Sequence, residues 1–270
     1  MALSFCKFEF LMFLALDLGN TNLTAGLFDG DALVAQWRMA TRRDATSDEL
    51  AVFLVTAMQA SGFDFHGIKG AALCSVVPTL TSQAAKFVRD YLKFEPLVVN
   101  GQTSIGLKNG YDDPRAVGAD RLVNGLAAWK EAGKGVVIAD FGTATTIDAV
   151  SPDGTYLGGA IAPGIGISSD ALFRAAAKLP RVDLQAPSKT LATNTVESIQ
   201  AGLVFGYAGL TKELISRSVS EIEANFGETP IVFATGGLAP LIAPFVPQIE
   251  RIEESLTING LRLIWQDRNR

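Results

Sequence analysis

Residues 13–28 read FLALDLGNTNLTAGLF, and this stretch decides the fold of the chain. It begins with a short apolar run, continues through Asp17, Gly19 and small polar residues, and ends in a second, β-prone run. Apolar runs of this length that are bounded by glycine are typical of buried strands. The stretch therefore predicts a hairpin whose polar turn follows directly after a buried strand.

A second stretch has the same layout. Residues 136–150 read VVIADFGTATTIDAV, with Asp140 and Gly142 in the places of Asp17 and Gly19. An internal repeat at such long spacing indicates two related halves, and the natural place for a ligand is the cleft between them.

Helix signals fill much of the remaining chain. Thr46 and Glu49 form a capping-box pattern, and Asn194 and Glu197 form another that opens a long helix ending near Gly227. We expect further helices over residues 81–92, capped by Thr81, and over residues 118–131 and 257–266, and further strands over residues 70–77 and 231–234. This mixture predicts an α/β fold with mixed sheets. The predicted divisions are an N-terminal extension over residues 1–11 and two domains over residues 12–124 and 125–270.

Composition narrows the possible functions. Of the 270 residues, 48% are hydrophobic and 19% are charged, which is ordinary for a globular protein with a sizeable core. The net charge of −5, without a run of Lys or Arg, argues against nucleic-acid binding. Two cysteines, Cys6 and Cys74, form no disulfide framework and indicate a reducing cytoplasm. The single histidine, His66, disfavours chemistries that need a His-paired nucleophile or several His ligands.

The N-terminus holds an apolar run over residues 10–16. Lys7 and Glu9 precede it, the run is short, and Asp17 follows it without a cleavage pattern. We interpret it as a buried first strand, because a signal peptide or a membrane span needs a different length and different flanks. Met12 is an alternative start of translation.

The two Asp-x-Gly turns favour nucleotide binding. Glycine lets the backbone approach a phosphate closely, consecutive turn N–H groups donate to its oxygens, and a carboxylate at a strand end can hold Mg²⁺. A single such turn is more often only a tight turn, but two matched turns shift the balance. Neither a Walker loop nor a Rossmann fingerprint is present.

Other candidates have ordinary structural readings beside the functional ones. Asp120 starts an amphipathic helix, where an acidic residue is favoured by the dipole; it could also act as a general base, with Arg121 binding a carboxylate. Tyr111 could close over a substrate or be a loop aromatic, and Thr195 needs no role beyond its helix start. The glycines of residues 158–166 could form a flexible cleft-lining loop or simply mark turns. The glycines of residues 235–240 could let the backbone lie against a flat or charged ligand such as adenosine, but a strand-to-helix turn is favoured.

Taken in order, these motifs resemble the type III pantothenate kinase family. The carrying strings are residues 17–21, Tyr111 with residues 118–121, residues 140–144, 163–164, 194–195 with 198–202, and 235–238. The likeness covers about residues 12–255. It implies the fold of the actin, hexokinase and heat-shock-chaperone superfamily, with two ribonuclease-H-like domains around an ATP cleft.

The resemblance also implies roles at individual positions. The ATP-binding residues would be Asp17, Leu18, Gly19, Asn20, Thr21, Asn22, Leu23, Thr24 and Thr143. The pantothenate-binding residues would be Tyr111, Gly118, Ala119, Asp120, Arg121 and, from the partner subunit of a homodimer, Thr195. Asp120 would be the base, Asp17 would place Mg²⁺, directly or through water, and Asp140 would bind a monovalent cation.

The implied activity is ATP-dependent phosphorylation of pantothenate, the first step of coenzyme A synthesis, in the cytoplasm and without a nucleic-acid or membrane partner. The alternative in another class is a non-catalytic nucleotide-binding regulator that assists transcription. A sugar or acetate kinase on the same scaffold is a second enzyme alternative, for which the chain is short.

The proposed site is short of positive charge in the sequence. Residues 17–28 and 136–150 contain no Lys or Arg, and Arg121 is the only cation near a motif. Crowded carboxylates and phosphates are costly in a cleft of reduced dielectric. We therefore expect K⁺ or NH₄⁺ to bind at Asp140 and activate the protein.

Overall fold

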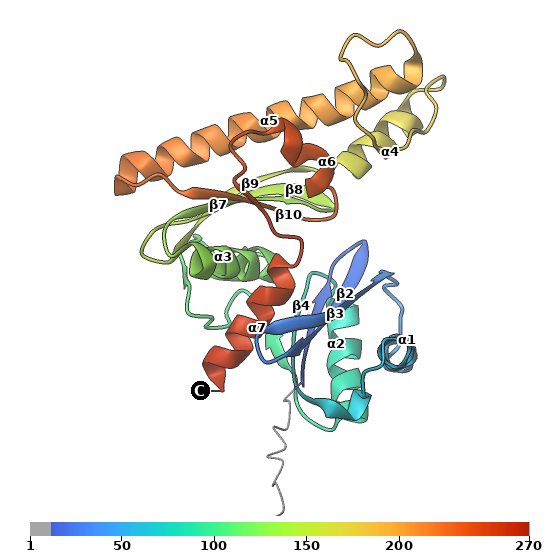
Figure 1. Cartoon of the computed structure of the whole chain (residues 1–270), viewed down its shortest axis with the longest axis vertical. Helices are drawn as coiled ribbons and strands as arrows, with labels where there is room; N and C mark the ends of the chain where they lie inside the picture. The colour runs from blue at the N-terminus through green and yellow to red at the C-terminus, as the bar shows by residue number, and fades with distance from the viewer. Residues whose placement is uncertain (1–11, 270) are drawn as a thin grey trace, which may run out of the picture. The chain divides into compact units, whose positions relative to one another are not determined.

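The computed structural model describes residues 12–269, so the N-terminal extension expected over residues 1–11 lies outside the described residues (Figure 1). Contacts divide the described chain into two compact units. The first unit holds residues 12–103, 118–120 and 257–269, and the second holds residues 104–117 and 121–256.

The first unit is built on a five-stranded sheet in the order β3-β2-β1-β4-β5. Strands β1 to β3 form an antiparallel meander, while β4 and β5 run parallel to β1. The strands are β1 (Met12–Leu18), β2 (Asn22–Asp29), β3 (Ala32–Ala40), β4 (Ile68–Ser75) and β5 (Leu97–Val99). The helices are α1 (Ser47–Ala60), α2 (Pro78–Phe87), which continues as a π-helical turn (Val88–Leu92), and α7 (Leu256–Arg268).

Helices cover both faces of this first sheet. Leu14, Leu16 and Leu18 occupy alternate positions of β1, so their side chains point to the same face of the sheet. They share a buried core with residues of α1 and α2. On the other face the Phe13 ring stacks on Trp265 of α7, with 4.8 Å between ring centroids. A Cβ at Gly26 or Gly70 would lie 2.3 Å from a side-chain carbon of α7, so both positions need glycine for this helix to seat.

The second unit is built on a six-stranded sheet in the order β11-β10-β7-β8-β9-β6. Its strands are β6 (Lys108–Asn109), β7 (Val136–Phe141), β8 (Ala144–Val150), β9 (Thr155–Pro163), β10 (Ile231–Thr235) and β11 (Arg251–Ile252). Its helices are α3 (Ala119–Ala132, whose first two residues group with the first unit), α4 (Ile165–Ala175), α5 (Thr195–Phe226) and α6 (Ala239–Ile242).

The two sheets share one topology. Strands β9-β8-β7-β10-β11 repeat the order and the directions of β3-β2-β1-β4-β5, with β6 added at the outer edge of β9. The repeat seen in the sequence is therefore a repeat of a whole ribonuclease-H-like sheet. The expected fold class, two mixed sheets flanked by helices, is confirmed.

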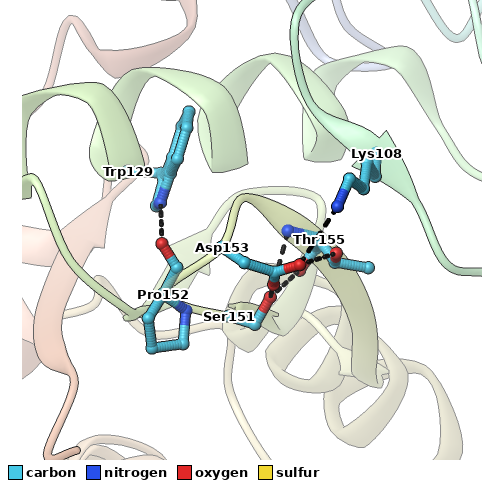
Figure 2. Close-up of polar contacts among 6 residues, drawn as sticks. All are labelled: Lys108, Trp129, Ser151, Pro152, Asp153 and Thr155. Atoms are coloured by element: carbon cyan, nitrogen blue, oxygen red, sulfur yellow. Dashed lines mark hydrogen bonds and ion pairs between the residues drawn. The ribbon is translucent and has the colours of Figure 1, made fainter. Parts of the chain in front are cut away.

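Helix α3 packs on the second unit, and Figure 2 shows one anchor of that packing at the turn between β8 and β9. The Trp129 indole N–H donates to the Pro152 carbonyl at 3.2 Å. Asp153 in the same turn accepts from Ser151 and pairs with Lys108 of β6 at 3.2 Å. Gly154 has a φ of +78°, and a Cβ there would meet the Trp129 ring at 2.7 Å.

Most predicted helix ends are confirmed. Thr46 and Glu49 form both hydrogen bonds of a capping box at the start of α1. Asn194 accepts from the Glu197 N–H at the start of α5, and this long helix ends at Gly227, whose φ is +69°. Gly133 follows α3 with a φ of +65°, as its predicted stop requires.

One prediction about local structure is wrong, and one alternative left open by the sequence is decided. Thr81 does not cap α2, which begins at Pro78; its hydroxyl instead donates to the Val77 carbonyl inside the first turn. Residues 158–166 are not a flexible loop, because they hold the end of β9 and the start of α4. A Cβ at Gly159 would lie 1.8 Å from the Ile147 carbonyl oxygen, so glycine here permits close strand contact.

The compact units also differ from the division expected at residues 124–125. Helix α3 follows the first sheet in sequence but packs mainly on the second, while α7 follows the second sheet and packs on the first. Among residues 12–269, no helix combines the length and the apolar character that crossing a membrane requires.

Candidate active site

The first Asp-x-Gly turn connects β1 to β2 through residues 19–21. The Gly19 N–H donates to the Asn22 carbonyl at 3.0 Å and closes the turn. Asn20, Thr21 and Asn22 are exposed, so their side chains and backbone can reach a ligand.

The other predicted ATP-binding residues of this stretch are less accessible. Leu18 and Leu23 are buried in the core, and Thr24 is also buried. The two leucine side chains therefore stabilise the strand ends, and only their backbone groups could serve a nucleotide.

Asp17 ends the first buried strand and lies in an environment that disfavours its charge. It sits opposite Cys74 in the parallel register of β1 and β4, and the Cys74 thiol donates to Asp17 Oδ1 at 3.5 Å. Burial raises the pKa of Asp17 to about 7, and the nearby Asp120 carboxylate adds to that rise, against opposing effects of Cys74 and Arg38.

The influence of Asp120 on Asp17 shows that the first unit brings these two carboxylates together from positions 103 residues apart (120 − 17 = 103). Asp120 lies in the first turn of α3, directly after Gly118 and Ala119. Two neighbouring carboxylates repel each other unless a cation or a proton lies between them, so this pair suits a site for a metal-bound polyphosphate.

The structure corrects the expectation that Arg121 is the only cation near the motifs. Arg38 of β3 is close enough to Asp17 to lower its pKa, against the rise that burial causes. Arg43, just beyond β3, donates from Nη2 to Asn20 Oδ1 at 3.3 Å. Arg38 reaches the first turn from a strand that pairs with β2, and Arg43 reaches it from the segment after that strand. The linear sequence reveals neither contact.

The second Asp-x-Gly turn connects β7 to β8 through Gly142 and Thr143. Thr143 is exposed on it, as a contact with ATP would require. Asp140 lies opposite Thr235 in the parallel register of β7 and β10. The buried Asn124 of α3 donates from Nδ2 to Asp140 Oδ2 at 3.3 Å.

Gly236 fits closely against Asp140. Its φ is +89°, and a Cβ there would lie 2.5 Å from Asp140 Oδ1 and 2.7 Å from the Phe141 backbone. Gly236, which the sequence favours as a plain turn residue, thus also lies against this carboxylate.

Arg121 takes part in a buried polar cluster of the second unit. Its Nε donates to Asp148 Oδ1 at 2.7 Å, and the Tyr156 hydroxyl donates to the same oxygen at 2.6 Å. The Thr146 hydroxyl donates to Asp148 Oδ2 at 2.8 Å. Burial raises the pKa of the Asp148 carboxyl, and the Arg121 ion pair opposes that rise.

Tyr111 joins this cluster from the loop before α3. Its ring contacts the Tyr156 ring, with 6.3 Å between centroids, and it lies over Gly158, where a Cβ would come within 3.3 Å of it. The structure therefore brings together Tyr111 and Arg121, two of the predicted substrate-binding residues.

Sequence reasoning also missed Asn124, Asp148 and Tyr156 of the candidate site. Asp148 carried a usable signal, because a carboxylate in the apolar run of a buried strand needs a partner. Asn124 and Tyr156 carried none, since an amide on a helix and a tyrosine on a strand are common.

Thr195 lies elsewhere in the second unit, at the start of α5. It lines a cavity of about 600 Å³ together with residues of α4 and the segment before α5. Five further residues of this wall are Leu172, Leu179, Asn194, Ser198 and Ile199. The mixture of apolar and hydroxyl groups suits a small, partly polar organic molecule.

The carboxylates fit metal ions whose remaining ligands come from outside the protein. Residues 12–269 contain no cluster of three His, Cys, Asp or Glu side chains that could enclose a metal. Mg²⁺ bound to nucleotides takes most ligands from phosphates and water and needs only one or two carboxylates. Asp17 offers such a carboxylate, and Asp140 offers an oxygen ligand beside backbone groups.

Comparison with known proteins shows the family of the chain. Residues 13–217 match the family model described as type III pantothenate kinase. The type III pantothenate kinase of Moorella thermoacetica is 46% identical over 255 residues, covering 94% of this chain and 99% of the relative.

Two solved structures show the same fold at low identity. A Campylobacter jejuni protein described as a Baf-family transcriptional activator aligns with a TM-score of 0.57 at 18% identity, over 95% of this chain and 98% of that one. A Sinorhizobium meliloti protein described as a 2-dehydro-3-deoxygalactonokinase aligns with a TM-score of 0.55 at 13% identity, over 94% and 96%. At these identities the likeness shows the fold alone.

Proposed function

Because this chain belongs to the type III pantothenate kinase family, we propose that it phosphorylates the 4′-hydroxyl of pantothenate with ATP, giving 4′-phosphopantothenate and ADP. This reaction opens coenzyme A biosynthesis. The observation that supports it best is that Asp120 raises the pKa of Asp17 through its charge, which agrees with a candidate base near the turn that would hold the phosphates.

Asp120 is the proposed general base. As the substrate hydroxyl oxygen attacks the γ-phosphorus, its proton passes to the Asp120 carboxylate, and the bond to the ADP oxygen breaks. Asn20, Thr21, Asn22 and the backbone of residues 17–24 bind the phosphates, and Thr143 contacts the nucleotide from the second turn. Mg²⁺ at Asp17, directly or through water, neutralises phosphate charge when bound.

Tyr111, Arg121 and the backbone of residues 118–119 are proposed to hold pantothenate. A guanidinium binds a carboxylate with directed hydrogen bonds, and the Asp148 ion pair fixes the orientation of Arg121. A monovalent cation, K⁺ or NH₄⁺, is proposed at Asp140. Arg38 and Arg43 offset part of the negative charge near the first turn, so the reason for this cation is local to Asp140.

A homodimer is the proposed assembly, with Thr195 contributing to the partner's substrate site. The exposed apolar side chains of α4 and the start of α5 support it. They are Ile167, Leu172, Phe173 and Val196, which are 37–49% exposed. We place the enzyme in the cytoplasm, where the buried free thiol of Cys74 stays reduced.

The test of this function is ADP release measured with and without pantothenate. We expect ADP only when both substrates are present. Asp120→Asn should lower kcat about 10²–10⁴-fold while MgATP still binds. A variant with near-normal kcat would remove Asp120 from the base role, and nucleotide binding without turnover in the unmodified protein would favour the regulator instead.

Mixing two inactive variants tests the shared site. Asp120→Asn disables the chain's own site, whereas Thr195→Ala disables the site of its partner. A mixed dimer then keeps one intact site, so activity should reappear after subunit exchange. Failure to recover activity, in mixtures shown to be mixed dimers, would contradict a contribution of Thr195 across subunits.

A further inference from the structure

The segment after β3 is tied to the first turn. The Thr41 N–H donates to the Thr21 carbonyl at 2.8 Å, and its hydroxyl donates to the Gly19 carbonyl at 2.7 Å. Two residues further on, the Arg43 guanidinium reaches Asn20 Oδ1 at 3.3 Å. The Thr79 hydroxyl donates to the Arg43 carbonyl at 3.0 Å and fixes its backbone.

Two adjacent arginines in this segment have different partners. Arg42 Nη1 pairs with Glu49 Oε1 at 2.9 Å, and its Nε lies 3.7 Å from Asp44. Among the ion pairs of residues 12–269 none includes Arg43, whose one side-chain partner is the neutral amide of Asn20. Arg43 is exposed, so it presents an uncompensated positive charge beside the turn.

The turn needs such a charge. Residues 17–28 contain Asp17 and no Lys or Arg, yet they are the proposed site for a strongly anionic triphosphate. A guanidinium has five donors in a planar fork and matches phosphate oxygens in pairs. The bond to Asn20 uses one nitrogen and holds the fork at the turn while leaving donors for a ligand.

We propose that Arg43 binds the phosphate groups of the nucleotide, and so does from the end of β3 what the lysine of a P-loop does from within its loop. This inference rests on the proposed function, since it assumes that residues 17–24 hold a nucleotide. The opposing interpretation is that Arg43 only braces the turn through Asn20.

Calorimetric titration with MgATP and with adenosine separates the two interpretations. Adenosine lacks phosphates, so a phosphate contact affects MgATP alone, whereas collapse of the turn affects any ligand that needs the folded unit. The variants are Arg43→Ala, Arg43→Lys and, as the matched control, Arg42→Ala. Both positions are exposed, and thermal unfolding confirms that each of the three variants folds.

We expect Arg43→Ala to weaken MgATP binding about tenfold, the scale of one charge-assisted contact in a partly solvated site, and to leave adenosine unaffected. Arg43→Lys should recover part of the loss, and Arg42→Ala should bind MgATP like the unmodified protein. If the unmodified protein binds no MgATP, the proposed function and this inference both fall.

Unchanged MgATP affinity in Arg43→Ala would overturn the inference and leave the kinase assignment standing. Equal losses for MgATP and adenosine, or an equal loss in Arg42→Ala, would assign Arg43 to bracing the turn and overturn the inference as well.

Discussion

The two Asp-x-Gly turns occupy the same place in two copies of one sheet, yet their surroundings differ. Asp17 lies opposite Thr24 across the hairpin and opposite Cys74 on the parallel neighbour, while Asp140 lies opposite Thr146 and Thr235. Residues 19–21 close the first turn, whereas Gly142 and Thr143 suffice for the second. The longer first turn exposes more backbone for a polyphosphate.

The contrast is sharpest two positions further along the second strand of each hairpin. Gly26 pairs with Ala15 in the first unit, and Asp148 pairs with Ile138 at the matching place in the second. Glycine there leaves room for Ile258 of α7, while the carboxylate holds Arg121 of α3. One position in the repeated fold thus serves helix packing in one unit and a polar cluster in the other.

Removing Asp148, the carboxylate that distinguishes the second unit, should have the largest effect on stability. Asp148→Ala leaves Arg121 buried without its partner, so we expect a loss of about 3–5 kcal/mol in unfolding free energy. Urea denaturation measures it. Tyr156→Phe is the matched control, because it deletes one hydrogen bond to the same oxygen and should cost about 1 kcal/mol. A loss below that of the control would show that the ion pair contributes little.

Replacing Asp140 and Asp17 one at a time should show that the two turns bind different cations. Asp140→Ala is expected to lower kcat/KM about 100-fold or more and to abolish activation by K⁺. Asp17→Ala should weaken MgATP binding and leave the response to K⁺ intact. The assay uses buffer free of K⁺ and NH₄⁺, followed by KCl or NaCl at matched ionic strength. Equal activation by both salts, or full activity with neither, contradicts a potassium site.

Adding a methyl group at Gly236 tests how closely this residue packs against Asp140. Gly236→Ala places a Cβ 2.5 Å from Asp140 Oδ1 at a φ of +89°, which should cost about 1–3 kcal/mol of stability and displace the carboxylate. Gly142→Ala is the control, since its Cβ would lie 3.4 Å from the same oxygen, near ordinary contact. Thermal unfolding and K⁺ titration of both variants measure the difference, and equal behaviour would refute the close fit.

The charge on Asp17 should make stability depend on pH. Its folded pKa of about 7 lies above the ordinary aspartate value of 3.8, so its contribution to stability is full below about pH 4 and is lost as the pH rises through 7. Asp17→Asn removes that loss. We expect the unfolding free energy of the variant to exceed that of the unmodified protein by roughly 1–2 kcal/mol at pH 8 and by nearly nothing at pH 4. The gain is smaller than the full pKa shift implies because Asp17 is only partly buried. Urea denaturation at both pH values gives the comparison, and a gain independent of pH would contradict it.

The sequence predicted what depends on neighbours along the chain. Both hairpins followed from their apolar runs, and the start of α1 followed from Thr46 and Glu49. Strand β3 was missed because its residues alternate between partly buried and exposed without a strong apolar run. The glycines of residues 158–166 suggest a flexible loop or turns in the sequence. In the structure, Gly159 and Gly164 permit close packing against neighbouring backbone instead.

Contacts between distant residues lay beyond such reasoning. Arg43 lies 23 residues from Asn20, and Asp148 lies 27 residues from Arg121, so neither contact leaves a local pattern. The charge balance deduced from the two turns alone was incomplete for the same reason. That balance included only the cations near the turns in the sequence. Arg38 reaches the first turn through strand pairing, and Arg43 reaches it from the segment after β3.

The placement of α7 has a consequence for how the protein is made. Phe13, Gly26 and Gly70 present one face of the first sheet to α7, a helix that the ribosome synthesises long after this sheet. The N-terminal sheet therefore keeps an apolar face open while more than 180 further residues emerge (256 − 70 = 186). The first unit is complete only after α7 has been translated, so a chain truncated before Leu256 would expose that surface permanently and be prone to aggregate.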